Sequence, residues 1–298
     1  MIVVTGGLGF IGKNLYNKLK EDGYDVVIKD VKTESLDGIR DWFMKNYPYI
    51  THVFHMGAIT DTTEMNTIKL DQYNYSFSIF IWNYCALRDI PLIYASSAAT
   101  YGDGKNGFND TTDIFKLKPL NPYAVSKQKF DEFAKSASHK PPQWYGLKFF
   151  NVYGFNELEK GGMASMIFHG YTQAKYKGSI KLFKSYNDNY GDGEQARDFV
   201  YVDDVVDVCM FFMNKKPKSG IYNIGTGKAR TFNDLAKSMF KSLDLSENIV
   251  YIDMPENLRD KYQYFTEAKI DKLRNAGYDG EFHDLEDGVF KYVQTLKK

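Results

Sequence analysis

The sequence predicts an α/β protein: a Rossmann-like, doubly wound parallel sheet with a smaller C-terminal domain. At the N-terminus, residues 3–12 (VVTGGLGFIG) place a glycine-rich turn directly after an apolar run. Short apolar runs then alternate with longer helix-like segments as far as residue 150, which is typical of parallel strands covered by helices on both faces. After Gly154 the alternation loosens, which favours a second, smaller domain.

Each expected strand is a short apolar run bounded by turn residues, and each expected helix lies between two such runs. The space between Asp30 and His52 holds little more than one helix, so a third strand near residues 37–39 is expected to be shrunken or missing. After a helix that begins at Asn233, we expect only a charged tail. The expected strands are 2–5, 26–30, 52–55, 92–96, 144–150 and 221–224, and the expected helices are 9–21, 39–46, 70–88, 123–136 and 163–174, with a strand edge and helix over 199–213.

Composition narrows the class of protein. The 298 residues carry 38 basic and 38 acidic side chains, and no basic block stands out, which argues against a nucleic-acid partner. The two cysteines, Cys85 and Cys209, have neither metal-binding nor redox spacing, so no metal is expected. No apolar run is long enough to cross a bilayer and the chain opens on a strand, so we expect a cytoplasmic protein without a membrane partner.

The glycines of the opening turn fall at Gly6, Gly9 and Gly12. In a strand–turn–helix unit they allow the tight turn, the approach of a pyrophosphate to the backbone, and close packing of helix on strand. The free N–H groups at the helix N-terminus attract the phosphates. The next strand ends at Asp30, whose carboxylate is suited to the 2′-hydroxyl of an adenosine ribose, which favours NAD. We therefore expect a dinucleotide site.

A second stretch carries proton-transfer chemistry. Tyr123 and Lys127 are spaced i, i+4 on one helix face, where an ammonium is expected to lower the pKa of the phenol. Such a phenol takes a proton from a sugar or alcohol hydroxyl. Ser97, after the strand at residue 92, is placed to assist. The same residues also have plain structural interpretations: an exposed helix pair, and hydroxyls that only cap a turn.

Together these stretches resemble the extended short-chain dehydrogenase/reductase family along the whole chain. The resemblance implies that Ser97, Tyr123 and Lys127 form the catalytic triad. It also implies a dinucleotide-binding domain over residues 1–153 and about 198–228, and a substrate domain over 154–197 and 229–298. The residues implied in cofactor binding are Gly6, Gly9, Phe10, Ile11, Gly12, Asp30, Val31, Lys32, Met56, Gly57, Ala58, Asn74, Lys127 and Val152.

Within that family, the runs 62–64, 95–102, 149–154, 160–165, 197–202 and 261–266 look like those of ADP-glycero-manno-heptose 6-epimerases, which act on a nucleotide-sugar. The resemblance implies that Lys160 is a second acid/base, facing Tyr123 across the sugar; by itself Lys160 is typical of a solvated loop. This sequence departs from the pattern of those epimerases at two places: Gly162 stands where they often have serine, and the loop over residues 184–196 is longer. The residues implied in substrate binding are Ser97, Asn151, Gly162, His169, Phe183, Arg197 and Tyr262.

Other functions and cofactors stay open. A nucleotide-sugar 4-epimerase, or another extended short-chain dehydrogenase acting on a nucleotide-sugar, needs the triad but not Lys160. A 4,6-dehydratase is excluded because Ala98 and Ala99 stand where an acidic pair is required. A cofactor-sensing protein without turnover would not need the Tyr–Lys pair. The resemblance implies NADP, with Lys32 as phosphate partner, whereas Asp30 favours NAD. Association into a homo-oligomer is expected through helices 70–88 and 123–136.

Overall fold

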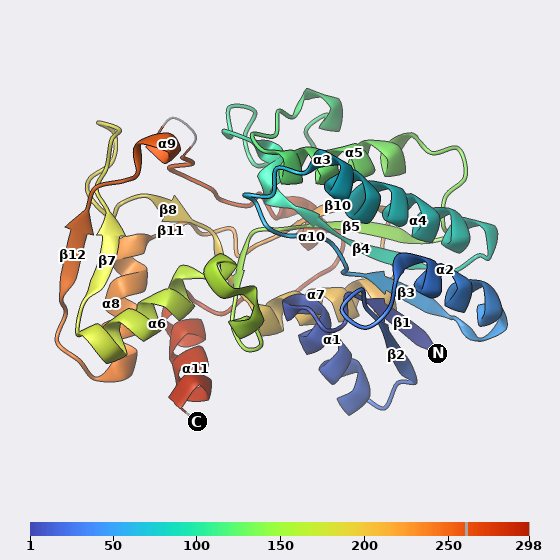
Figure 1. Cartoon of the computed structure of the whole chain (residues 1–298), viewed down its shortest axis with the longest axis horizontal. Helices are drawn as coiled ribbons and strands as arrows, with labels where there is room; N and C mark the ends of the chain where they lie inside the picture. The colour runs from blue at the N-terminus through green and yellow to red at the C-terminus, as the bar shows by residue number, and fades with distance from the viewer. Residues whose placement is uncertain (260–261, 298) are drawn as a thin grey trace.

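The computed structural model describes residues 1–259 and 262–297 (Figure 1). Its centre is a six-stranded sheet of order β10-β5-β4-β3-β1-β2, in which every neighbouring pair is parallel. This confirms the predicted sheet, including its strand positions to within one residue. The strands are β1 (Ile2–Thr5), β2 (Val26–Lys29), β3 (His52–His55), β4 (Leu92–Ser97), β5 (Trp144–Phe149) and β10 (Gly220–Ile224).

Helices cover both faces of this sheet because alternate strand residues enter two different cores. Val3 and Leu92 face α2 (Leu36–Lys45), α4 (Phe77–Leu87) and α5 (Pro122–Ser136). Their neighbours Val4 and Ile93 face α1 (Phe10–Glu21) and α7 (Val202–Lys215), which contribute buried leucines and valines. The sheet is therefore doubly wound.

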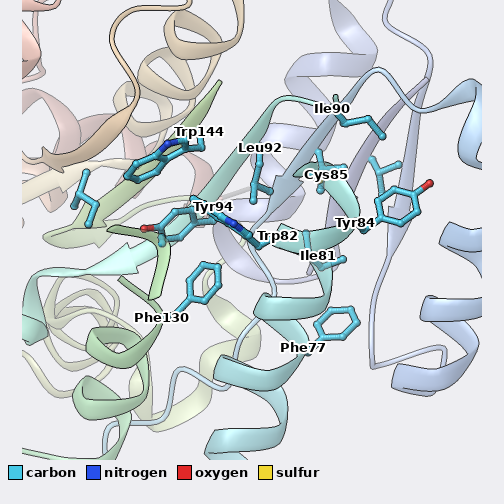
Figure 2. Packing of buried hydrophobic residues seen from close by; sticks show 14 of the residues in the cluster. Phe77, Ile81, Trp82, Tyr84, Cys85, Ile90, Leu92, Tyr94, Phe130 and Trp144 are labelled. Carbon is cyan, nitrogen blue, oxygen red and sulfur yellow. The ribbon is translucent and has the colours of Figure 1, made fainter. Parts of the chain in front are cut away.

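An aromatic cluster holds α4 and α5 against the sheet (Figure 2). The rings of Trp82 and Trp144 meet edge to face with centroids 5.2 Å apart, and those of Tyr94 and Phe130 with centroids 4.8 Å apart. Edge-to-face pairs of this kind add directional stabilisation to the apolar area that they bury. The cluster fixes where α5, the helix of the Tyr–Lys pair, lies over β4 and β5.

The region between β2 and β3 departs from the full two-crossover pattern, as expected. Residues 37–39 form no strand; they belong to α2, which begins at Leu36 rather than at residue 39. The helix begins early because the Ser35 side chain accepts a hydrogen bond from the Gly38 N–H and caps it. A single helix and one short 3₁₀ turn (Tyr47–Tyr49) fill the connection.

The C-terminal part lies to one side of the sheet (Figure 1) and has a third core between α6, α8 and α11. The stretch expected as a charged tail contains a further helix: α11 buries Leu285, Val289, Tyr292 and Val293. Helix α6 begins three residues later than expected because Ser165 caps it. Whether the domains divide at residue 153 stays a prediction. The helices are α6 (Met166–Lys177), α8 (Phe232–Leu243), α9 (Glu256–Arg259), α10 (Asp271–Asn275) and α11 (Leu285–Lys297). Three two-stranded sheets are formed by β7 (Ile180–Phe183) and β12 (Ile249–Ile252), by β6 (Asn151–Tyr153) and β9 (Phe199–Tyr201), and by β8 (Ala196–Arg197) and β11 (Arg230–Thr231).

A buried histidine links β1, β3 and α4. The Nδ1 of His55 lies 2.6 Å from Thr5 Oγ1, and its Nε2 lies 2.8 Å from Ser78 Oγ. Burial, helped by the positive charge of Lys127, lowers the pKa of His55 to about 3. The imidazole is therefore neutral in the folded protein at ordinary pH.

The free energy of unfolding is expected to fall as the pH is lowered from about 6.5 towards 3. In that window the unfolded chain takes up a proton on His55, whose unperturbed pKa is 6.5, and the folded protein does not. Urea unfolding at several pH values, with the His55→Asn variant as comparison, measures this. The variant should show a shallower dependence, and equal slopes would contradict the assignment.

Among residues 1–259 and 262–297, none of the helices has both the length and the apolar character needed to cross a membrane.

Candidate functional site

A cavity of about 970 Å³ opens where the strands of the central sheet end at their carboxyl sides. Ligands of doubly wound sheets bind at this edge. The cavity brings together all four predicted catalytic residues, Ser97, Tyr123, Lys127 and Lys160. The predicted cofactor residues that line it are Gly6, Gly9, Phe10, Ile11, Gly12, Asp30, Val31, Lys32, Met56, Gly57, Ala58, Lys127 and Val152.

The glycine-rich turn is closed so tightly that side chains are sterically excluded from it. Gly6 has a φ of +68°, and a Cβ placed there would lie 2.4 Å from Gly57 Cα. A Cβ on Gly12 would lie 2.2 Å from the carbonyl oxygen of Gly6. Helix α1 follows Gly9 without any side-chain cap, so its first N–H groups are free for an anion. This cradle fits the pyrophosphate of a dinucleotide.

The far end of the cradle carries one acidic and one basic side chain. Asp30, at the end of β2, accepts hydrogen bonds from Leu8 N at 3.0 Å and from Lys32 N at 2.9 Å. A carboxylate has lone pairs left for a ribose hydroxyl. The Lys32 ammonium donates to the Leu8 carbonyl and forms an ion pair with Glu159, which belongs to the segment that carries Lys160. The chemistry of these groups suits the hydroxyls of an adenosine ribose.

The Tyr–Lys pair lies in the first two turns of α5, where Asn121 caps the helix and Pro122 is the first helical residue. The Lys127 Nζ donates to the Ala95 carbonyl at 3.0 Å, which ties α5 to β4. Burial lowers the pKa of Lys127 to about 8, and Asp131 opposes that shift.

The pKa of Tyr123 differs from the sequence-based expectation. The structure places this phenol in a buried position, and burial raises its pKa, whereas a hydrogen bond with Ser97 lowers it. The expected lowering by the ammonium of Lys127 is not the dominant effect. The sequence pattern located the pair correctly but could not reveal how far the protein removes it from water.

Lys160 lies in a 3₁₀ segment (Leu158–Met163) that borders the same cavity. Its Nζ lies 5.2 Å from the centroid of the Phe10 ring, at the start of α1, and burial lowers its pKa. The segment is held at both ends by Glu157, a fully buried carboxylate that sequence reasoning missed. Glu157 accepts hydrogen bonds from Gly154 N at 3.3 Å and from both N and Oγ of Ser165 at 2.7 Å.

Asn74 does not line the cavity, although it was predicted to contact the cofactor. It lies in a π-helical turn (Asp71–Ser76) that replaces the regular start expected for this helix. Its side chain bonds to both N and O of Ile59 and to the Oγ of Ser126 on α5. Asn74 therefore holds a cavity-lining loop against α5.

The predicted substrate residues fall into three groups. Ser97 and Asn151 line the cavity. Arg197 packs beside it: its guanidinium carbon lies 5.6 Å from the ring of Phe232, a lining residue, and 5.2 Å from the ring of Tyr262, which also contacts Phe183. Gly162 and His169 are outside the lining, and the His169 ring instead contacts that of Phe168 on α6.

The long loop over residues 184–195 is fastened to the segment around α9. Asp253 accepts hydrogen bonds from Lys184 Nζ and from the Tyr186 hydroxyl, each at 3.1 Å. The guanidinium of Arg259 lies 3.8 Å from the centroid of the Tyr186 ring. These contacts tie the loop to the segment around α9.

Sequence reasoning also missed the lining residues Asn121, Phe232 and Gln263. Gln263 belongs to the run 261–266 that carried the resemblance, and it donates to the Gly102 carbonyl. Lys261, which opens that run, lies outside the described residues. Within residues 1–259 and 262–297, no three His, Cys, Asp or Glu side chains are grouped as a metal site requires.

Comparison with known proteins agrees with this geometry. The chain is 48% identical to an ADP-L-glycero-D-manno-heptose-6-epimerase of Fusobacterium nucleatum, over 99% of this chain and 97% of that protein. It is 44% identical to the enzyme of that name from Nitratidesulfovibrio vulgaris, with the same coverage. The crystal structure of the Helicobacter pylori ADP-L-glycero-D-manno-heptose-6-epimerase matches with a TM-score of 0.80 and 28% identity, over 99% of this chain and 96% of that one.

More distant structures share the fold. A Thermus thermophilus UDP-glucose 4-epimerase in complex with NAD matches with a TM-score of 0.79 at 22% identity, over 99% of this chain and 98% of that one. Residues 2–225 also match the model of one family. The chain belongs to the NAD dependent epimerase/dehydratase family.

Proposed function

We infer that the protein is an epimerase that inverts C6 of ADP-glycero-manno-heptose by transient oxidation to a ketone. One observation carries this inference: a single cavity contains the glycine cradle, the Tyr–Lys pair and Lys160. The relatives that share almost the whole chain at 48% and 44% identity bear the corresponding name. A cradle and a Tyr–Lys pair support oxidation and reduction of an alcohol, and a second basic group supports inversion.

The reaction follows from the chemistry of the carbon. A secondary alcohol carbon without an activating group has no acidic C–H bond, so inversion by simple deprotonation is unavailable. A nicotinamide dinucleotide held by the glycine cradle and Asp30 would supply the hydride-transfer chemistry that oxidation to a ketone and reduction from its opposite face require. The oxygen then occupies two positions, and each position needs its own proton carrier.

The residues of the chain are proposed to divide this work. Tyr123, as the phenolate, takes the proton from the hydroxyl in one position and becomes the neutral phenol. Ser97, which lowers the pKa of Tyr123, and the ammonium of Lys127 favour the phenolate from which this step starts. In the other position the Lys160 ammonium gives its proton to the oxygen as the ketone is reduced, and burial, which lowers the pKa of Lys160, favours that release. Arg197 is suited to the diphosphate because its charge is permanent and its donors are planar.

An assay of purified protein with both ADP-heptose C6 epimers tests this function. The expected result is the same equilibrium mixture from either epimer, followed by NMR or chromatography. UDP-glucose and UDP-N-acetylglucosamine serve as controls for 4-epimerisation, the alternative that needs no second base. Turnover of the UDP-sugars without turnover of ADP-heptose would overturn the assignment.

For the cofactor, we propose NADP rather than NAD. Support comes from the half-exposed ammonium of Lys32, which borders the cavity beside Asp30. A 2′-phosphate at that position has to replace Glu159 as the partner of Lys32, because the two anions repel each other.

Lys32→Gln is therefore expected to weaken NADP binding about tenfold, the loss of one charge-assisted hydrogen bond, and to leave NAD binding within about twofold. Glu159→Gln is expected to strengthen NADP binding. Titrations of both cofactors, followed by fluorescence or calorimetry, measure this. Tighter binding of NAD than of NADP by the wild-type protein would reverse the proposal.

We also propose that the protein is a cytoplasmic homo-oligomer that associates through α4 and α5. Leu87 on α4 and Val125 on α5 are 78% and 39% exposed, and a partner at these helices would cover such apolar surface. Light scattering after size-exclusion chromatography tests the proposal, and a monomer at micromolar concentration would refute it.

A further inference from the structure

A buried ion pair lies beneath the Tyr–Lys pair, and the reaction above gives it no proton to carry. Lys148 on β5 and Asp131 on α5 are 2% and 0% exposed, and the lysine Nζ lies 2.6 Å from the carboxylate Oδ2. Taking two charges out of water is costly, and a neutral replacement of such a pair is often as stable as the pair itself. Stability alone therefore does not account for its presence.

The ion pair is connected to the strand end that carries Ser97. The Nζ of Lys148 donates to Thr100 Oγ1 at 2.5 Å, and the Thr100 hydroxyl donates to the Ser97 carbonyl at 2.8 Å. By a second route, the hydroxyl of Ser96 donates to Asp131 Oδ2 at 2.6 Å. The end of β4 and the 3₁₀ turn that follows it (Ala98–Tyr101) are thus tied to α5.

The carboxylate at the centre lies on the active face of α5. Asp131 follows Lys127 by one helical turn and Tyr123 by two, so the three side chains share one face. The network therefore joins the element that carries Ser97 to the helix that carries the other two members of the triad.

Packing around the carboxylate is arranged for this network. The Tyr94 hydroxyl donates to Asp131 Oδ1 at 3.0 Å, and its ring packs beside Trp82 and Phe130 with the hydroxyl directed away from Trp82 (Figure 2). A Cβ on Gly146, the partner of Tyr94 across the strands, would lie 2.4 Å from this hydroxyl. The glycine in β5 thus leaves room for the phenol.

We propose that Asp131 and Lys148 are positioning residues, which fix Ser97 at the distance from Tyr123 and Lys127 that proton transfer requires. The proposal rests on the proposed function in that it takes these three residues as the catalytic triad. Small displacements of such groups reduce rates strongly, because reacting atoms must be held in a narrow range of geometry.

Electrostatics gives the carboxylate a second, measurable effect. Burial lowers the pKa of Lys127, and the charge of Asp131 raises it. The other titratable groups that face Lys127 are the phenol of Tyr123, on the same helix, and His55 on β3, which is neutral at ordinary pH. Removal of the Asp131 charge therefore makes Lys127 lose its proton at lower pH.

The neutral double variant Asp131→Asn/Lys148→Met separates positioning from folding. Each single variant leaves one buried charge unpaired and should lower the melting temperature; the double variant should melt closer to the wild type. Its kcat is expected to fall at least tenfold, with cofactor affinity at pH 7 within twofold. Cofactor binding is expected to weaken at alkaline pH, as Lys127 loses its proton. In the double variant this weakening is expected to occur at lower pH than in the wild type. Lys148→Arg, which keeps the charge, should retain most of the wild-type kcat.

Thr100→Val tests the same idea with the charges in place. It removes the link between Lys148 and the Ser97 carbonyl, so we expect a several-fold loss of kcat. The pH at which cofactor binding weakens on the alkaline side should not change. Wild-type kcat in this variant, or wild-type kcat and pH profile in the double variant, would overturn the proposal. Cofactor binding can be measured without the sugar, so it separates the two proposals. A wild-type protein without activity on ADP-heptose would refute the proposed substrate. An unchanged pH dependence of cofactor binding in the double variant would refute the role of Asp131.

Discussion

Lys160→Met is expected to lower kcat for epimerisation by a factor of about 10² to 10⁴, the usual contribution of a general acid or base. Methionine keeps an unbranched side chain of similar length, one atom shorter than lysine, but cannot carry a proton. Cofactor affinity should change by less than about threefold, because the triad and the glycine cradle are untouched. Initial rates with ADP-heptose, together with a cofactor titration, measure both quantities.

A matched control separates this loss from a general effect of removing a lysine. Lys177, at the end of α6, is exposed and lies outside the cavity, so Lys177→Met should keep wild-type activity. Full activity in the Lys160 variant would discard the two-base mechanism and favour a one-base epimerase of the 4-epimerase kind.

Tyr123→Phe is expected to reduce kcat by a factor of 10² to 10⁴ as well, since it removes the phenol hydroxyl and leaves the buried ring in place. The melting temperature should stay within a few degrees of the wild type. Steady-state kinetics and thermal unfolding measure the two effects. Tyr176 on α6 is 70% exposed, so Tyr176→Phe is the control and should leave both kcat and the melting temperature unchanged. Activity above half of the wild-type value in the Tyr123 variant would remove the phenol from the mechanism.

Most of the sheet could be predicted because buried parallel strands have continuous apolar sequences. The runs at 2–5 and 52–55 coincide with β1 and β3, and the glycines after the first run indicate the start of α1. Helix α11 was not predicted, because charged residues such as Glu286 and Lys291 led to the expectation of a charged tail. Its buried positions Leu285, Val289, Tyr292 and Val293 are nonetheless spaced i, i+4, i+7 and i+8, a periodicity that was available in the sequence.

Site residues that are close in the sequence could be predicted from a local motif, whereas residues that only the tertiary structure brings together could not. Tyr123 and Lys127 are four residues apart, so their shared face follows from helix geometry. Asp131 and Lys148 are 17 positions apart, and no local pattern pairs them. Burial is equally non-local, which is why the direction of the Tyr123 pKa shift was wrong: proximity of an ammonium was visible, whereas loss of water was not.

The central claim, that the hydrogen on the inverted carbon leaves as a hydride and returns to the same carbon, is tested most directly by epimerisation in D₂O. Mass spectrometry and NMR of the product report whether C6 has acquired deuterium. The account predicts no deuterium at C6 above background, even after the epimers have equilibrated, because the hydride does not exchange with solvent. Deuterium at C6 would contradict the account, since it requires removal of that hydrogen as a proton.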